Sequence, residues 1–187
     1  NADNVIAMGN NMVVGCATTT AKNSILLGNN INFASKNDMA NAISIGDFSR
    51  ANTGAVAVGV SAQADVNAAV ALGANAVVTQ VNSVALGADS STTAAVPTTN
   101  AVINGLTHSF AGANPVGVVS VGSAGKERQV QNVAAGQIND KSTDAINGSQ
   151  LYASNSVINQ NSTDITELQK GWTLARKNGA KTKQKPA

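Results

Sequence analysis

A four-residue pattern recurs along the first half of the chain: a large apolar residue, a small residue, a second large apolar residue and a glycine. Strand-like alternation gives a period of two, and the glycine allows a tight corner after each strand. The closing glycines are 19, 18, 13, 14 and 14 residues apart, which predicts stacked coils of a parallel β-solenoid over residues 1–91. The copies are Ile6–Gly9, Ile25–Gly28, Ile43–Gly46, Val56–Gly59, Val70–Gly73 and Val84–Gly87, and the small residue is Ala or Ser in all but the second, which has Leu26.

The alternation within each copy separates the large residues from the small one. Val70 and Leu72 share one face of their strand and Ala71 lies on the other. We expect each large pair to be buried against the neighbouring coils. The opposite face stays small and uncharged, which suggests close approach by the backbone of a partner subunit. The alternative is a monomeric solenoid whose alanine face meets water.

Residues 92–119 follow the repeats and form a bridge. Ala101–Ile103 and Leu106–Phe110 flank Asn104-Gly105, which is a strong hairpin signal. Val116–Val121 reads as a further strand.

The apolar period changes within residues 120–150, from near 2 to near 3.5, so this segment joins two different architectures. Ser142-Thr143-Asp144 is a good N-cap cluster for a following helix. Isoleucine at core positions of a heptad favours trimers, and one buried asparagine fixes the register. The alternative is one amphipathic helix packed on its own domain. In the heptad register, the a positions are Leu151, Ile158, Ile165 and Trp172, and the d positions are Ser154, Asn161 and Leu168.

Composition excludes several classes of site. Aromatic residues make up 3% of the chain and charged residues 12%, which favours a narrow repetitive structure over a thick core. The single cysteine, Cys16, can form no intrachain disulfide, and the single histidine, His108, has no evident catalytic partner. Residues 173–187 form a basic tail without interleaved aromatics, so we expect no nucleic-acid binding. No apolar run is long enough for a spanning helix.

Two segments carry a resemblance to a known family. Ser120–Gly136 and Ser142–Leu151 resemble the neck motif of trimeric autotransporter adhesins, and Asn82–Ser90 resembles the repeat of YadA-like heads. The resemblance implies an all-β, left-handed parallel β-roll (solenoid) head, followed by a neck over 120–150 and a parallel trimeric α-helical coiled coil over 151–172. It also implies that Asn161 at a d position binds an anion such as chloride on the stalk axis; the alternative is an asparagine bridged by water.

The same resemblance implies a function. We expect a non-enzymatic homotrimer without cofactors, displayed on the outer membrane of Gram-negative bacteria as a passenger fragment that itself inserts into no membrane. Its expected partners are collagen, fibronectin or laminin of the host matrix, host cells, or other copies of the adhesin. The irregular segments Met12–Ala21 and Asn30–Met39 are where we expect ligand preference to be set. The alternatives are a structural spacer and a trimeric β-helix acyltransferase with His108 as its base.

Overall fold

The structure is a computed structural model that describes residues 2–12, 21–31 and 39–182. Cys16 and most of the segments Met12–Ala21 and Asn30–Met39 lie outside the described residues. The chain forms two compact units, Asn1–Gln129 and Val130–Ala187.

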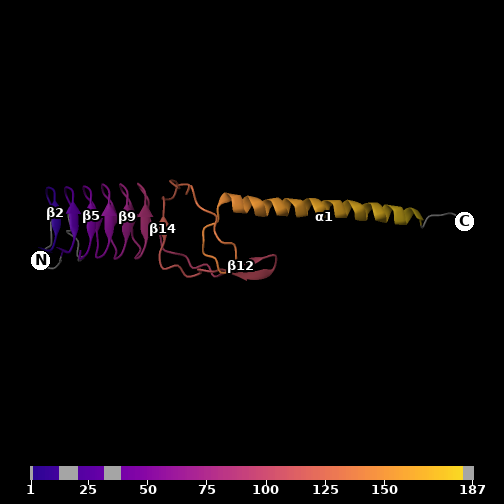
Figure 1. The fold of residues 1–187 in the computed structure, drawn as a ribbon, viewed down its shortest axis with the longest axis horizontal. Helices are drawn as coiled ribbons and strands as arrows, with labels where there is room; N and C mark the ends of the chain where they lie inside the picture. The colour runs from indigo at the N-terminus through magenta and orange to yellow at the C-terminus, as the bar shows by residue number, and fades with distance from the viewer. Residues whose placement is uncertain (1, 13–20, 32–38, 183–187) are drawn as a thin grey trace. The chain divides into compact units, whose positions relative to one another are not determined.

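The first unit contains the predicted parallel solenoid, whose short strands stack coil upon coil (Figure 1). Seven strands form one long parallel sheet in the order β14-β11-β9-β7-β5-β4-β2, and smaller sheets are ordered β10-β8-β6 and β1-β3. The strands of these sheets are β1 (Ala2–Asp3), β2 (Ile6–Met8), β3 (Ala21–Lys22), β4 (Ile25–Leu27), β5 (Ile43–Ile45), β6 (Arg50–Ala51), β7 (Val56–Val58), β8 (Gln63–Ala64), β9 (Val70–Leu72), β10 (Val77–Val78), β11 (Val84–Leu86) and β14 (Val119–Ser120).

The corners of the coils explain two recurring residue types. The closing glycines stack so closely that a Cβ on Gly59 would lie 2.5 Å from the carbonyl carbon of Gly73, and Gly59 also has a φ of 136°. In the long sheet, the corner before each of the six strands β2, β4, β5, β7, β9 and β11 is left-handed, with φ between 53° and 65°, a region that asparagine and glycine tolerate best. This corner residue is Asn4, Asn23, Asn41, Gly54, Ala68 or Asn82.

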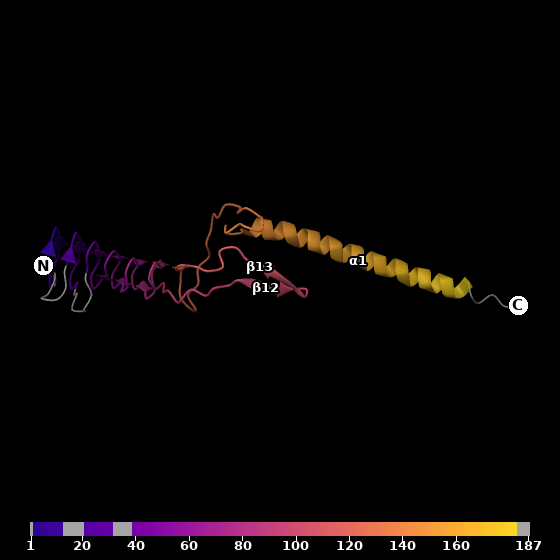
Figure 2. The same ribbon diagram turned by 90° about the horizontal axis from the view of Figure 1, so that it is seen from below.

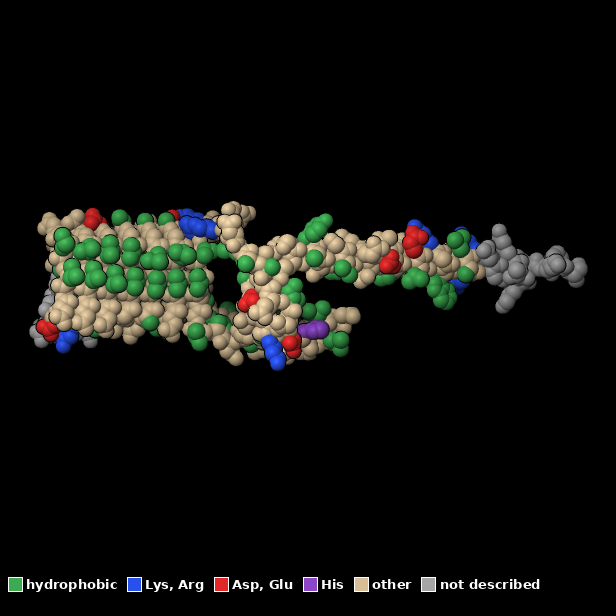
Figure 3. All heavy atoms as spheres, in the orientation of Figure 1, with side chains coloured by type: hydrophobic (Ala, Val, Ile, Leu, Met, Phe, Trp, Pro, Cys, Tyr) green, Lys and Arg blue, Asp and Glu red, His purple; other side chains and the backbone are tan. Residues whose placement is uncertain are grey.

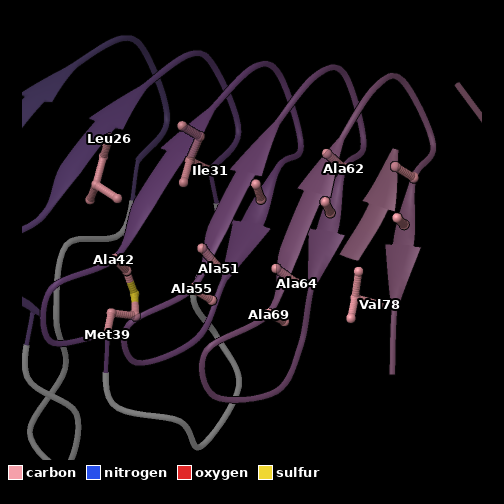
Figure 4. Packing of buried hydrophobic residues seen from close by; sticks show 14 of the residues in the cluster. Leu26, Ile31, Met39, Ala42, Ala51, Ala55, Ala62, Ala64, Ala69 and Val78 are labelled. Atoms are coloured by element: carbon pink, nitrogen blue, oxygen red, sulfur yellow. The ribbon is translucent and has the colours of Figure 1, made fainter. Parts of the chain in front are cut away.

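The interior of the solenoid is filled by the small residues, so our assignment of the two faces is wrong. Ala57, Ala71 and Ala85 are completely buried inside their own chain, whereas the large residues beside them keep part of their surface exposed. A coil of 13 or 14 residues encloses little space, and side chains from its walls meet there. Alanine therefore predominates among the buried apolar residues, several of which point inward in Figure 4.

Buried serines complete this interior. Each finds a hydrogen-bond partner there, as when the hydroxyls of Ser44 and Ser49 lie 2.8 Å apart. The hydroxyl of Ser83 donates to the carbonyl of Val81 at 3.2 Å and accepts from the backbone N–H of Val118 at 3.1 Å. Among the described residues, every buried side-chain nitrogen and oxygen has a hydrogen-bond partner. The interior therefore avoids the free-energy cost of burying an unpaired polar group.

The predicted hairpin in the bridge is confirmed. Strands β12 (Asn100–Ile103) and β13 (Leu106–Ser109) pair antiparallel, with Ile103 opposite Leu106, and are seen side by side in Figure 2. Asn104 and Gly105 have φ of 51° and 77°, as a two-residue type I′ turn requires. The strand predicted at Val116–Val121 is shorter, since only β14 (Val119–Ser120) pairs, parallel to β11. The bridge thus leaves the solenoid and returns to the long sheet.

In the second unit, the residues that the structure describes form one helix, α1 (Gly148–Thr182), which includes the first ten residues of the basic tail. The predicted N-cap at Ser142-Thr143-Asp144 is wrong: the cap is Asn147, whose Oδ1 accepts a hydrogen bond from the N–H of Gln150 at 3.3 Å. The earlier segment is held out of the helix because Asp144 accepts from the N–H of Gln137 at 3.0 Å. The Gln150 side chain also bonds both backbone groups of Gly136.

Candidate interaction surfaces

Two parallel rows of large apolar side chains run along the outer face of the long sheet, and we call them the apolar rows (Figure 3). The parallel register places equivalent residues directly beside one another from coil to coil. The first row is Ile6, Ile25, Ile43, Val56, Val70, Val84 and Val119. The second row is Met8, Leu27, Ile45, Val58, Leu72 and Leu86.

The apolar rows are uncovered in the single chain. Every member is at least partly exposed, and the exposed fraction of the residue reaches 69% at Val119 in the first row and 68% at Met8 in the second. Side chains in neighbouring strands of a sheet are about 4.8 Å apart, so the rows form one continuous strip rather than scattered residues. No ionisable residue interrupts either row. Continuous apolar strips of this kind mark surfaces that other molecules cover.

The α1 helix shows a second uncovered apolar seam. The apolar residues at its predicted core positions are exposed by more than half of their surface, with Ile158 at 61% and Trp172 at 71%. A shallow hollow beside Trp172 is lined by Glu167, Leu168, Gly171 and Ala175. Asn161, the expected anion ligand, lies on this helix at the d position between Ile158 and Ile165, and its side chain is exposed.

Polar ladders stabilise two corners of the coils. The Asn4 side-chain amide donates to Asn23 Oδ1 at 3.2 Å, and that of Asn23 donates to Asn41 Oδ1 at 3.3 Å. At the other corner, Asn75 Nδ2 donates to Asp89 Oδ1 at 3.1 Å. This hydrogen bond, assisted by Lys126, lowers the pKa of Asp89 below its usual value. The side chains of these corner residues therefore follow the same coil-to-coil register as the strands.

An ion pair between Arg50 and Asp65 connects two coils at the sheet β10-β8-β6. Arg50 donates to the Asp65 carboxylate from Nε at 3.0 Å and from Nη2 at 2.6 Å, and Nη2 also contacts Gln63 Oε1 at 2.8 Å. The hydrogen bonds to Asp65 raise the pKa of the Arg50 guanidinium. Both partners are more than a third exposed, so the pair orients side chains more than it stabilises the fold.

Arg128 caps the last coil of the solenoid. Its guanidinium donates to the carbonyl oxygens of Ala88 and Val121, both at 2.6 Å, and to Ser90 Oγ at 3.1 Å. Nearby, Lys126 pairs with Asp89 at 3.2 Å. These contacts fix the chain that follows β14 onto the end of the coil stack. Sequence reasoning did not identify Arg128, because nothing in its local pattern distinguishes a capping arginine from a solvated one.

The remaining candidate for chemistry, His108, lies on β13 opposite Ala101 with its side chain exposed. The described part of the chain contains no group of three or more His, Cys, Asp or Glu residues that could hold a metal ion. Within the same residues, no helix is both long and apolar enough to cross a bilayer.

Two family models match the chain. The coiled stalk of trimeric autotransporter adhesin matches residues 129–172, and the YadA head domain repeat matches twice, at residues 51–76 and 67–90. The match to the stalk model begins in the segment that the sequence assigned to the neck, and the head repeats coincide with the most regular coils.

Curated relatives match over shorter stretches. The chain is 49% identical over 81 residues to the autotransporter adhesin BtaE of Brucella suis biovar 1, a match that covers 43% of this chain and 11% of BtaE. It is 47% identical over 55 residues to the autotransporter adhesin EhaG of Escherichia coli O157:H7, covering 29% of this chain and 3% of EhaG. The chain therefore corresponds to a small part of these relatives.

Solved structures share the fold. The C-terminal YadA-like domain of BPSL2063 from Burkholderia pseudomallei is 49% identical, with a TM-score of 0.51 over 54% of this chain and 46% of that one. The collagen-binding domain of the Yersinia adhesin YadA is 24% identical, with a TM-score of 0.51 over 82% of this chain and 68% of that one.

Proposed function

We propose that this chain, which matches the models of the YadA head domain repeat and of the coiled stalk of trimeric autotransporter adhesin, acts as a homotrimer in attachment of a bacterial surface to its host. The relatives are adhesins, so we assign no catalytic activity to the chain. The proposed assembly rests on one observation: the apolar rows run along the whole coil stack, and residues of the same chain do not cover them.

The trimer is proposed to bury the apolar rows and the α1 seam against identical chains. A repeat with constant register offers the same apolar strip on every copy, so three chains can pack side by side in register. On the stalk, isoleucine at the core positions 158 and 165 also favours a trimer. Light scattering on the purified chain tests this directly, and a folded monomer at micromolar concentration would sink the proposal.

Attachment is proposed to rest on many weak contacts. The coils are quasi-identical, so a contact made once is repeated along one chain and again on its partners, and effective concentration raises the total affinity. Residues 1–119 hold only eight charged side chains, so binding should depend little on salt. The proposed ligands are fibrous matrix proteins such as collagen, fibronectin or laminin, or the surfaces of host cells, and contacts between trimers would cause autoagglutination.

The test compares the whole chain with residues 120–187 alone on immobilised collagen, fibronectin and laminin. We expect binding by the whole trimer and little by the shorter form. Equal binding by both would move the ligand site out of the head. Failure of the whole chain on every surface would instead favour a spacer that holds another module away from the cell. Display on the outer membrane is part of the proposal and is tested by antibody labelling of intact cells.

Asn161 is proposed to hold an anion on the stalk axis. Three copies of its exposed side chain would meet at a d position, where their amide groups can all donate. A halide would accept these hydrogen bonds, and bromide serves as its probe in anomalous diffraction. We expect an anomalous peak on the axis of the wild type and none in Asn161→Leu. If the wild type shows no peak, Asn161 sets the register of the helices and binds no anion.

A further inference from the structure

The chain contains three Asn-Gly pairs, and two of them lie in contrasting environments. Asn104-Gly105 forms the tip of the β12–β13 hairpin, and Asn147-Gly148 starts α1. The third, Asn178-Gly179, lies near the end of α1. Glycine has no Cβ to shield its backbone nitrogen, which makes an asparagine before it unusually open to intramolecular attack.

Asn104 lies in an unprotected segment. Asn104 and Gly105 are exposed, and a Cβ added to Gly105 would meet nothing within 4 Å. Within the described part of the chain, the Asn104 side chain makes no hydrogen bond. Every residue of the hairpin except Ala101 is exposed. A two-stranded hairpin without packing is marginally stable, so its turn opens readily.

Asn147 is held on all sides by comparison. Its Oδ1 accepts from Ser149 Oγ at 2.7 Å and from the N–H of Gln150 at 3.3 Å, and its Nδ2 donates to the carbonyl of Val133 at 3.1 Å. Gly148 is already the first residue of α1. The helix fixes the backbone nitrogen of Gly148, and the cap fixes the side chain that it would attack.

We propose that Asn104 is a site of spontaneous deamidation and that Asn147 is protected from the same reaction. When the turn opens, the backbone nitrogen of Gly105 attacks Cγ of Asn104. The new C–N bond closes a succinimide ring, the bond from Cγ to the side-chain nitrogen breaks, and the proton lost by the Gly105 nitrogen leaves with that group as ammonia. Water then opens the ring at either carbonyl, giving aspartate or isoaspartate. No oxidant or enzyme is needed.

The modification changes the hairpin permanently. Isoaspartate adds one methylene to the backbone of a two-residue turn, and the pairing of Ile103 with Leu106 allows no extra backbone atom. Either product also places a negative charge at the tip of a hairpin whose other residues include only one ionisable side chain, His108. The hairpin of an aged chain therefore differs from that of a new one in charge and in register.

The experiment incubates the assembled full chain at neutral and mildly alkaline pH and maps its peptides by mass spectrometry. Isoaspartyl methyltransferase serves as the reagent for the β-linked product. We expect Asn104 in the assembled chain to deamidate at nearly the rate of the free peptide 100–109. Asn147 should stay intact over the same period. Asn104→Gly removes the reactive amide while keeping a Gly-Gly turn of the same type, so the methyltransferase signal mapped to the peptide that contains residue 104 should disappear without loss of fold.

Two results would overturn the proposal. If Asn104 stays intact in the assembled chain while the peptide converts, the hairpin is closed or covered. If Asn147 converts as fast as Asn104, the contacts of the cap give no protection. Neither result bears on adhesion or on the trimer itself, which are measured separately.

Discussion

The solenoid and the helix differ in where their apolar residues find partners. In the solenoid, Ala57 and Ala71 are completely buried within their own chain. In α1, every residue whose side chain is described is exposed except Gln150, which is partly exposed; Ile165 is exposed by 55% and Leu168 by 65%. The solenoid has an interior of its own, whereas the described side chains of α1 form none.

This difference indicates two kinds of stability. The coils hold one another through backbone hydrogen bonds and buried alanines, so the solenoid retains contacts at any protein concentration. A single helix in water gains little from its own hydrogen bonds, and most helical stability comes from packing. We therefore expect the helix to depend on assembly and the solenoid interior to depend mainly on itself.

The largest effect is expected from Ile158→Asn combined with Ile165→Asn. Each isoleucine is worth about 2–5 kcal/mol when it is truncated in a packed core, so the double change should abolish stalk assembly. Helical circular dichroism should fall and become dependent on protein concentration, while the strand signal remains. Loss of both signals together would show that the solenoid also needs the stalk.

Ala71→Leu should destabilise the solenoid at every protein concentration. The side chain points into a filled interior between Ala57 and Ala85, and overpacking costs about 1–3 kcal/mol. Denaturant unfolding measures this loss. The matched control is Leu72→Ala in the adjacent apolar row, which should weaken assembly and leave the interior intact. Equal destabilisation by both changes under dilute conditions would contradict the assignment of faces.

Arg128→Gln should loosen only the last coil. The change removes charged donors from the carbonyls of Ala88 and Val121, so amide exchange should rise around β14 and stay low in β7 and β9. Lys170→Gln is the control, because Lys170 forms an ion pair with Glu167 on the exposed surface of the helix and lies in the other unit. Uniformly faster exchange along the solenoid would mean that the cap supports the whole stack.

The smallest effect is expected from acid. The hydrogen bond from Asn75, followed by Lys126, lowers the pKa of Asp89 from 3.8, so the folded state keeps this carboxylate ionised to lower pH than the unfolded state does. Its contribution to stability is present above pH 3.8 and is lost as the pH falls through the lower folded pKa. The stability difference between the wild type and Asp89→Asn should therefore shrink on acidification. If this difference stays constant over the acid range, the ionisation of Asp89 does not contribute to the pH dependence of stability.

The sequence predicted the solenoid, the hairpin and the helix because each rests on local spacing. Gly59 and Gly73 recur at a fixed interval, and Asn104-Gly105 has few alternatives to a type I′ turn. The faces could not be assigned the same way. Alternation shows that Val70 and Leu72 share a face, but only the width of the closed coil decides that this face is outside. The small interior of a 14-residue coil is the signal that would have decided it.

The helix start was mispredicted for a non-local reason. Ser142 and Asp144 are good capping residues, yet Asp144 instead binds the N–H of Gln137, seven positions earlier. Asn147 became the cap because Gln150 ties the helix start to Gly136. Such contacts depend on the path of the preceding segment, which no local pattern encodes.

The bridge has a practical consequence for protein engineering. Ser91 pairs with Val77 on one coil, and Val119 pairs with Val84 on the long sheet, so the segment between them begins and ends on established strands. The N–H of Ser91 also bonds the carbonyl of Gly122 at 2.9 Å, which brings the chain on either side of the insertion together. A foreign loop or small domain grafted between Ser91 and Val119 would therefore have both ends anchored. The coil stack then becomes a display scaffold whose cargo can be exchanged without altering its register.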